Sequence, residues 1–425
     1  MRLVPVPLGR RLLVDPATRS YEGGRLLVGG SRVLRLTPDG AAVAARLLAG
    51  DAVGSRVDAL LARRLLDAGV AHPVVASSAP VPAYEVVVPA YGDRPLHHLP
   101  AAPVVVVDDG SPSPIRCDAR VLRHDRNRGP AAARNTGMRA TAAEVVAFVD
   151  SDATVDARAL DALAAMLASD PALGAVAPRI RPAPSHPSVL GRFADAFSPL
   201  DMGPRSGPVG PVPYVPSTVL VVRRAAFDEI GGFDERLRIG EDVDFVWRLV
   251  EAGWSVRYAA EVEATHDEPR TWSRWLIRRA RYGTSAGRLA LSPNGLPTMV
   301  ASLPPAVIAR IAVEQSVGIS RWLTQTWWLL LAYGFTCRRV RPLCGAVLLA
   351  PAAVEYVRRR PRLDPLRWTV AMLADDVTYG IGVWVGCTRA RTTRPLMPIT
   401  RRARTPRPRD RADRPRPPAG SGRRL

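Results

Sequence analysis

The sequence contains no lysine, so all 59 of its lysine-or-arginine positions are arginines. It has only four cysteines, Cys117, Cys337, Cys344 and Cys387, with neither a CxxC pair nor the spacing of a zinc site. This scarcity argues against a disulfide framework and suits a reducing compartment. The first residues, MRLVPVPLGRRLLVDP, lack the long apolar core of a secretion signal. We therefore expect the folded chain to stay on the cytoplasmic side.

The composition favours a globular protein of two or three domains with a strong positive charge. Apolar residues make up 47% of the 425 residues and charged residues 23%, which excludes disorder of the whole chain. The net charge of +20 would suit two classes of partner, nucleic acid and anionic membranes. A simpler explanation of the many arginines is the codon usage of a GC-rich genome. No nucleic-acid-binding signature appears. Much of the excess lies beside apolar stretches and after Thr400, which favours an anionic membrane surface as partner and no nucleic acid.

Residues 1–75 have the pattern of a small domain of their own. Strand-like runs at 11–14, 25–28 and 33–36 precede two helical segments, the first of them capped by Thr37. This order of strands and helices resembles the winged-helix peptide-recognition domains of the PqqD-like type. A cap that stabilises the fold and binds no ligand is the alternative.

Residues 82–290 follow a linker at 76–82 and alternate between strand and helix signals. This alternation predicts an α/β domain with a parallel-rich sheet. The expected strands are 83–89, 104–107 and 145–149, and the expected helices are 128–141 and 157–168.

Residues 291–400 are expected to form a helical, membrane-associated region. The runs 322–337 and 343–354 are apolar and uncharged, and arginines separate them. Both are shorter than the roughly 20 residues that cross a bilayer unaided, so spanning helices and helices lying on the surface both remain open. A buried helical subdomain is the alternative. The arginine- and proline-rich tail at 401–425 is expected to be disordered and to bind anionic lipid.

Two of the expected strands run directly into acidic residues. Ligands of open α/β sheets bind at the carboxyl ends of strands, so these acids are expected at a pocket. Two carboxylates separated by one residue can hold Mg²⁺ or Mn²⁺ together with substrate phosphates. Either motif alone could be a solvated turn. The acids are Asp108 and Asp109 after the run 104–107, and Asp150 and Asp152 after the run 145–149.

A basic segment and a second acidic segment complete the candidate site. Arg128 and Arg134 would supply positive charge near a diphosphate, and a surface helix with two arginines is the alternative. Glu241 and Asp242 open another helix, where a carboxylate can either cap the helix or accept a proton as a general base. His266 is a candidate metal or diphosphate ligand, although a lone histidine is more often structural.

In this order and spacing the four clusters resemble the GT-A fold of family 2 glycosyltransferases over residues 82–290. The resemblance implies an inverting transferase that uses a nucleotide sugar and a divalent metal, Mn²⁺ or Mg²⁺. It implies Asp242 as the general base, with Glu241 in reserve. The implied metal ligands are Asp150, Asp152 and His266. The residues implied for nucleotide-sugar binding are Pro89, Asp108, Asp109, Arg128, Arg134, Asn135 and Asp150.

Two further segments, 272–286 and 375–384, indicate one group of enzymes within this family. Together with the PqqD-like N-terminal domain they are similar to the glycosyltransferases of the mycofactocin system, across nearly the whole chain. This similarity implies UDP-glucose as donor, a peptide-derived redox cofactor precursor as acceptor, and β-linked glucose units added at the cytoplasmic face of the membrane. Three alternatives remain: a family 2 enzyme acting on a lipid or cell-envelope polysaccharide, a nucleotidyltransferase, and a non-enzymatic membrane or peptide-binding scaffold.

Overall fold

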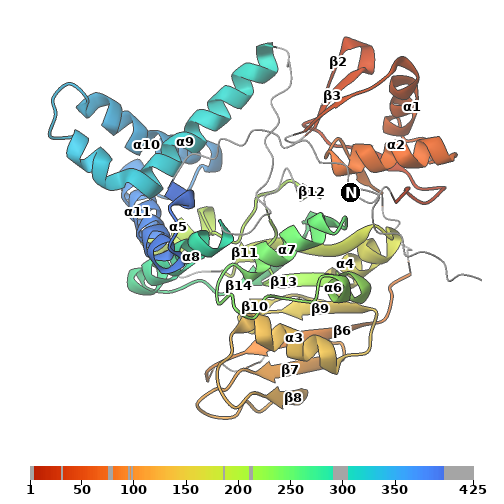
Figure 1. Ribbon diagram of the computed structural model, residues 1–425, viewed down its shortest axis with the longest axis horizontal. Helices are drawn as coiled ribbons and strands as arrows, with labels where there is room; N and C mark the ends of the chain where they lie inside the picture. The colour runs from red at the N-terminus through yellow and green to blue at the C-terminus, as the bar shows by residue number, and fades with distance from the viewer. Residues whose placement is uncertain are drawn as a thin grey trace, which may run out of the picture.

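The structure, a computed structural model, describes residues 4–29, 32–74, 80–93, 96, 99–184, 187–209, 214–290 and 305–396. The predicted tail at 401–425 and most of the predicted linker lie outside these residues. The described chain forms an N-terminal domain, a central sheet flanked by helices, and a C-terminal group of helices (Figure 1).

The N-terminal domain packs two helices against short antiparallel strands. Thr37 caps the first helix, as the sequence predicts, by accepting a hydrogen bond from the backbone N–H of Gly40. Leu47, Ala62 and Leu65 are fully buried in its core. Its elements are β1 (Leu12–Val14), β2 (Arg19–Tyr21), η1 (Glu22–Gly24), β3 (Leu26–Gly29), β4 (Arg32–Arg35), α1 (Pro38–Leu48), α2 (Arg56–Asp67) and β5 (Ala71–Pro73). Strand β1 pairs with β5, and β3 lies between β2 and β4.

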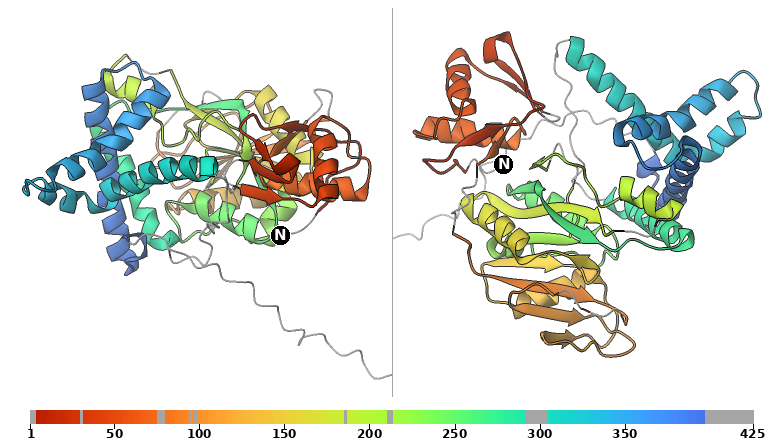
Figure 2. Two further views of the ribbon diagram at one scale, coloured as in Figure 1. Left: turned by 90° about the horizontal axis from the view of Figure 1, so that it is seen from above. Right: turned by 180° about the vertical axis from the view of Figure 1, so that it is seen from behind.

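Buried polar contacts hold the N-terminal domain against the central one. Arg63 of α2 is 2% exposed, and its Nη2 donates to Asp170 Oδ1 over 2.6 Å. His72 of β5 contacts Arg257, with 2.8 Å between Nδ1 and Nη2. The red domain accordingly lies beside the upper edge of the sheet in the view from behind (Figure 2).

The central domain contains a mixed sheet in the order β10-β14-β11-β13-β9-β6-β7-β8, with β12 paired to β14. Strands β6 to β9 are mutually parallel, which confirms the predicted α/β class, whereas β13 is antiparallel to both of its neighbours. The strands are β6 (Tyr84–Ala90), β7 (Val104–Asp108), β8 (Arg120–Arg123), β9 (Val145–Val149), β10 (Ala153–Thr154), β11 (Leu173–Pro182), β12 (Gly207–Pro208), β13 (Val219–Arg223) and β14 (Ser255–His266).

Helices cover both faces of this sheet because successive strand side chains point to opposite sides. Val86 and Val88 of β6 belong to the core on one face, which includes Leu163 of α4. Val87 belongs to the core on the other face, which includes Met138 of α3 and Phe245 of α7. The helices are α3 (Pro130–Ala140), α4 (Ala157–Ser169), α5 (Val189–Ala196), α6 (Arg224–Glu229) and α7 (Glu241–Glu251).

Among the C-terminal helices, α8 and α11 pack closely through glycines. A Cβ atom placed on Gly283 would lie 2.1 Å from the carbonyl oxygen of Tyr379, and one on Gly382 would lie 1.9 Å from that of Ala280. Only glycine therefore allows the two backbones to approach this far. The elements are α8 (Trp272–Leu289), α9 (Pro305–Gly334), α10 (Arg341–Arg359), α11 (Pro365–Ala390) and η2 (Arg394–Leu396).

The predicted apolar run 322–337 lies in α9 up to Gly334, and the run 343–354 lies in α10. Within the described chain, however, the one helix long and apolar enough to cross a membrane is α11, judged by length and composition only. Half of its most apolar window is buried inside the protein, where it packs against α8 and α9.

Candidate functional site

A cavity of about 780 Å³ opens where the parallel strands β6, β7 and β9 end. Several of the predicted residues, far apart in the sequence, line it because the carboxyl ends of parallel strands meet at one edge of a sheet. The predicted residues that line this donor-side cavity are Pro89, Asp109, Arg134, Asp150, Asp152 and Glu241.

Arg134 of α3 connects two of the acidic motifs. Its Nη2 donates to Asp150 Oδ1 over 2.6 Å, and its Nη1 donates to Glu241 Oε1 over 2.9 Å. Arg134 is 2% exposed, so its pair with Glu241 is shielded from water, whereas the Asp150 side chain is 25% exposed. The sequence predicts Arg134 as a ligand of the substrate. The structure shows that it also fixes the carboxylates of β9 and α7 relative to each other.

Asp108 and Asp109 have different environments at the end of β7. Asp108 is fully buried and does not line the cavity, because its carboxylate accepts hydrogen bonds from Ser111, Ile115 and Arg123. These bonds outweigh burial and lower the pKa of Asp108. Through these hydrogen bonds, Asp108 stabilises the loop after β7.

Asp109 lines the cavity and is oriented by three donors. Its Oδ1 accepts from the backbone N–H of Arg128 and lies 2.7 Å from His124 Nδ1, and its Oδ2 accepts from the backbone N–H of Gly129. His124 is itself held by Thr136, with 3.0 Å between Nε2 and Oγ1. A carboxylate oxygen can accept two hydrogen bonds, so Oδ2 retains capacity for one further donor.

The predicted metal ligands lie close together at the ends of β9 and β14. His266 Nε2 is 3.5 Å from Asp152 Oδ1, and His266 Nδ1 is buried without a hydrogen-bond partner among the described residues. Burial raises the pKa of Asp150 to about 6, against the charge of Arg134. No group of three or more His, Cys, Asp or Glu side chains in the described part of the chain is arranged to hold a metal by itself.

This donor set fits a divalent cation that is completed by a ligand. Carboxylate oxygens and an imidazole suit Mn²⁺, and Mg²⁺ is usually bound by one or two carboxylates plus substrate phosphates. A cation beside Asp150 and Asp152 would also stabilise the ionised carboxylates that burial and mutual repulsion disfavour.

Glu241 and Asp242 begin α7 after Gly240, whose φ of 82° lies in the left-handed region. Glu241 forms an ion pair with Arg134. Asp242 forms no ion pair with any described residue and accepts one hydrogen bond, from the backbone N–H of Val243, over 2.8 Å. Burial, and next the charge of Glu241, raise the pKa of Asp242 to about 7. Asp242 is therefore the better proton acceptor of the two.

Besides Asp108, Asp242 and His266, two more predicted residues, Arg128 and Asn135, do not line the donor-side cavity. Arg128 Nη2 donates to Glu235 over 2.7 Å, and Asn135 holds the backbone of Phe233 through two hydrogen bonds. Both side chains therefore fix the loop that leads from α6 to α7, close to the cavity.

A second cavity, of about 1190 Å³, lies on the other side of the α7 N-terminus. Asp242 lines this cavity and not the first, while Arg134, Asp150 and Glu241 line both. Its wall also includes residues of α8, α9 and α11, such as Tyr282, Arg321 and Tyr379. Other parts of the wall come from residues 197–202, from the segment before β13, from α10 and from residues 393–395. We call it the acceptor-side cavity.

Sequence reasoning missed the basic side chains at the mouth of the donor-side cavity. Arg281 and Arg288 line it from α8, and Thr284 and Ser285 lie between them. These four positions follow the i, i+3, i+4, i+7 spacing of one helix face, a signal that is present in the sequence. Arg236 and Arg238 join them from the loop before α7, and Arg389 from α11.

The chain is similar in sequence to several known proteins. Residues 145–354 match the protein family described as "Glycosyl transferase family group 2". The pre-mycofactocin glycosyltransferases of Mycobacterium tuberculosis strains CDC 1551 and H37Rv are each 34% identical over 476 aligned positions, covering 94% of this chain and 100% of theirs. The N-acetylglucosaminyl-diphospho-decaprenol L-rhamnosyltransferase of M. tuberculosis is 36% identical over 24% of this chain and 36% of its own.

Among solved structures, the mannosyltransferase PcManGT from Pyrobaculum calidifontis, in complex with GDP-Man and Mn²⁺, is 21% identical to this chain. It covers 71% of this chain and 87% of its own, with a TM-score of 0.40. With so low a TM-score, this structural similarity adds no support beyond that of the sequence comparisons.

Proposed function

Because the chain belongs to the pre-mycofactocin glycosyltransferase family within the family 2 glycosyltransferases, we propose that it transfers glucose from UDP-glucose to a peptide-derived precursor of a redox cofactor, with inversion. The α/β domain is then its GT-A glycosyltransferase domain. The observation that carries the proposal is the place of Asp242, on the acceptor-side cavity, directly beyond the carboxylates of the donor-side cavity.

The roles of the side chains follow from their positions. Asp242 takes the proton of the acceptor hydroxyl, whose oxygen forms a bond to the anomeric carbon while the bond from that carbon to the diphosphate breaks. The diphosphate leaves with the electron pair. A single displacement from the opposite face turns an α-linked donor into a β-linked product. Arg134 keeps Glu241 and Asp150 in place, and Arg281 and Arg288 lie where they can neutralise the departing diphosphate.

Asp150, Asp152 and His266 would hold the divalent cation, Mn²⁺ or Mg²⁺. When bound there, the cation supplies positive charge to the leaving diphosphate. Asp109 offers one further acceptor position on Oδ2, which suits a nucleobase with a ring N–H such as uracil.

The experiment that tests the function is UDP release from UDP-glucose, with Mn²⁺ or Mg²⁺, in the presence and absence of pre-mycofactocin. We expect acceptor-dependent release that EDTA abolishes and that added Mn²⁺ restores. Release from a different nucleotide sugar, or onto a lipid or polysaccharide acceptor, would keep the enzyme class and overturn the assigned substrates. Turnover of a nucleoside triphosphate would favour a nucleotidyltransferase. No nucleotide release from any donor would favour a non-enzymatic scaffold.

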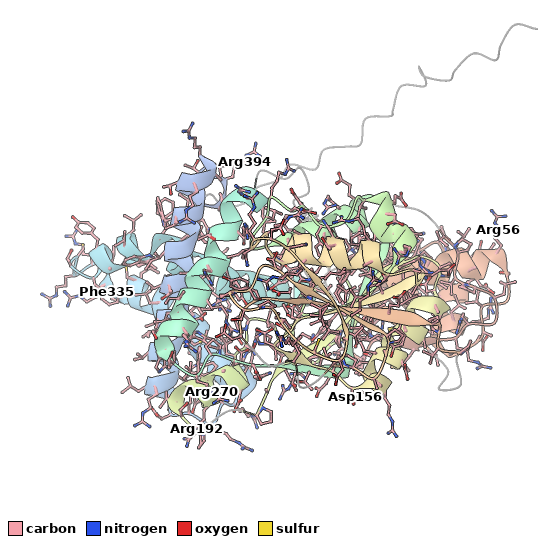
Figure 3. All side chains as sticks on the ribbon, turned by 90° about the horizontal axis from the view of Figure 1, so that it is seen from below. Arg56, Asp156, Arg192, Arg270, Phe335 and Arg394 are labelled. Carbon is pink, nitrogen blue, oxygen red and sulfur yellow. The ribbon has the colours of Figure 1, made fainter. Side chains whose placement is uncertain are left out.

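We also propose that the turn between α9 and α10 binds the cytoplasmic face of an anionic membrane. Phe335 lies at the end of the helical group farthest from the sheet (Figure 3). Exposed apolar side chains surround it, and exposed Arg338, Arg339 and Arg341 stand beside them to contact anionic headgroups. The exposed apolar side chains of this tip are Leu329, Leu330, Tyr333, Phe335, Val340 and Leu343.

Flotation with vesicles measures this binding. We expect the protein to float with vesicles that contain phosphatidylglycerol, less with pure phosphatidylcholine, and not after Leu329, Leu330 and Tyr333 are all changed to serine. Leu13→Ser, at an apolar position of the N-terminal domain that is 63% exposed, is the matched control and should float as the parent does. Equal flotation of the triple variant and the parent would contradict the proposal.

A further inference from the structure

The acceptor-side cavity has a group of tyrosines around the candidate base. Tyr214, Tyr282 and Tyr379 line it together with Asp242 and come from three distant segments: the chain before β13, α8 and α11. Burial, and next the charge of Asp242, raise the pKa of Tyr214, and the other two tyrosines act in the same direction. The three phenols and the carboxylate therefore form one cluster.

The hydroxyl groups of this cluster are available to a ligand. None of the three phenol oxygens has a hydrogen-bond partner among the described residues. Two of the rings are held by arginines: the guanidinium of Arg278 lies 5.9 Å from the ring centre of Tyr282, and that of Arg279 lies 5.1 Å from the ring centre of Tyr379. The three side chains are only partly buried, so their hydroxyl groups can exchange water for the polar groups of a ligand, and together they offer a binding surface.

Three of the arginines that line the same cavity are neutralised by acids, whereas Arg238 and Arg394 bond to Asn127 and to the carbonyl oxygen of Ala290. Arg279, Arg321 and Arg359 all line the cavity. Each is paired within the helical group: Arg279 Nε with Asp375 over 2.6 Å, Arg321 Nε with Asp376 over 3.0 Å, and Arg359 with Glu355. These three arginines therefore add little free charge beside the tyrosines, and this part of the wall presents aromatic faces and hydroxyl groups to a ligand.

We propose that Tyr214, Tyr282 and Tyr379 bind the acceptor, and that they select an uncharged ring that carries hydroxyl groups. This inference rests on the proposed transfer to an acceptor hydroxyl. A phenol both donates and accepts hydrogen bonds, which matches hydroxyl groups, and its ring face packs on the flat face of a pyranose or an aromatic ring. The cluster holds such a ring with one hydroxyl directed at Asp242.

The assignment makes α11 part of the acceptor site, outside the segment 145–354 that matches the family. Tyr379 reaches the cavity because the glycines of α8 and α11 bring the two backbones together at this level, where a Cβ on Gly283 would meet the carbonyl of Tyr379 itself. The same glycines therefore account both for the close packing of α8 and α11 and for the position of the Tyr379 phenol.

The test measures steady-state kinetics of Tyr214→Phe, Tyr282→Phe and Tyr379→Phe with pre-mycofactocin as acceptor. Removal of one hydroxyl should raise the KM for the acceptor by about 2- to 10-fold per variant, the effect of one hydrogen bond. The KM for UDP-glucose and the melting temperature should not change. Tyr21→Phe, in β2 of the N-terminal domain and outside both cavities, is the matched control and should behave as the parent protein.

The class of acceptor is tested with three small probes: a 4-alkylphenol, phenyl β-glucoside and phenyl β-glucuronide. Use of the phenol or of the glucoside identifies which hydroxylated ring the cluster accepts, and either supports the proposal. Preference for the charged glucuronide would overturn it. An unchanged acceptor KM in all three tyrosine variants would overturn the assignment of the residues while UDP release by the parent protein still supported the transferase itself.

Discussion

Replacement of Asp242 by asparagine is expected to lower kcat by about 10²- to 10⁴-fold, the usual contribution of a general base. Asparagine has the same shape but cannot accept the proton of the acceptor hydroxyl. The KM for UDP-glucose should change little, because Asp242 lines the acceptor-side cavity and not the donor-side one. The measurement is acceptor-dependent UDP release at saturating donor.

The matched control is Asp244→Asn in the same helix. Asp244 pairs with Arg248 over 2.7 Å and lines neither the donor-side nor the acceptor-side cavity, so its loss should leave kcat within a few-fold of the parent value. A small loss in Asp242→Asn, equal to that of the control, would move the role of base to Glu241.

The pH profile gives a second readout of the same role. Burial and the charge of Glu241 raise the pKa of Asp242 to about 7, and a general base works in its ionised form. The kcat of the parent protein should therefore rise as pH increases through about 7 and level off above it. Asp242→Asn should lose this rise, and a parent profile that is flat from pH 5.5 to 8.5 would contradict the assignment.

Local features of the fold could be predicted from the sequence because their physical cause is local. Thr37 caps α1 through a bond three residues away, and Asp150 and Asp152 follow an apolar strand whose end marks the pocket. Of the apolar run 104–107 in β7, residues 105–107 are buried, as expected of such a run, and Val104 is partly buried. These patterns need only a few neighbouring residues.

The contacts of the site could not be predicted in the same way, because they join distant segments. Arg134 and Glu241 are 107 residues apart, and no sequence pattern shows that they pair. Asp108 and Asp109 look equivalent in the sequence, yet the loop after β7 buries the first and leaves the second at the cavity. The tyrosine cluster combines three segments whose approach depends on the packing of α8 against α11.

The second large effect is expected from Asp375→Ala in α11. Asp375 is fully buried, accepts a hydrogen bond from Trp275 Nε1 over 2.9 Å, and pairs with Arg279 Nε over 2.6 Å. Alanine would leave the guanidinium of Arg279 buried without its counter-charge. Removing one partner of a buried ion pair costs about 3 to 5 kcal/mol in the free energy of unfolding. Urea unfolding, followed by tryptophan fluorescence, measures it.

Asp364→Ala in the same helix is the matched control for Asp375→Ala. Asp364 caps the N-terminus of α11 by accepting from the backbone N–H of Arg367, and its side chain is 48% exposed. The loss of this cap should cost about 1 kcal/mol. Because Arg279 also lines the acceptor-side cavity, Asp375→Ala should raise the KM for the acceptor, whereas Asp364→Ala should not. Equal unfolding free energies for the two variants would show that the buried pair does not hold α8 and α11 together.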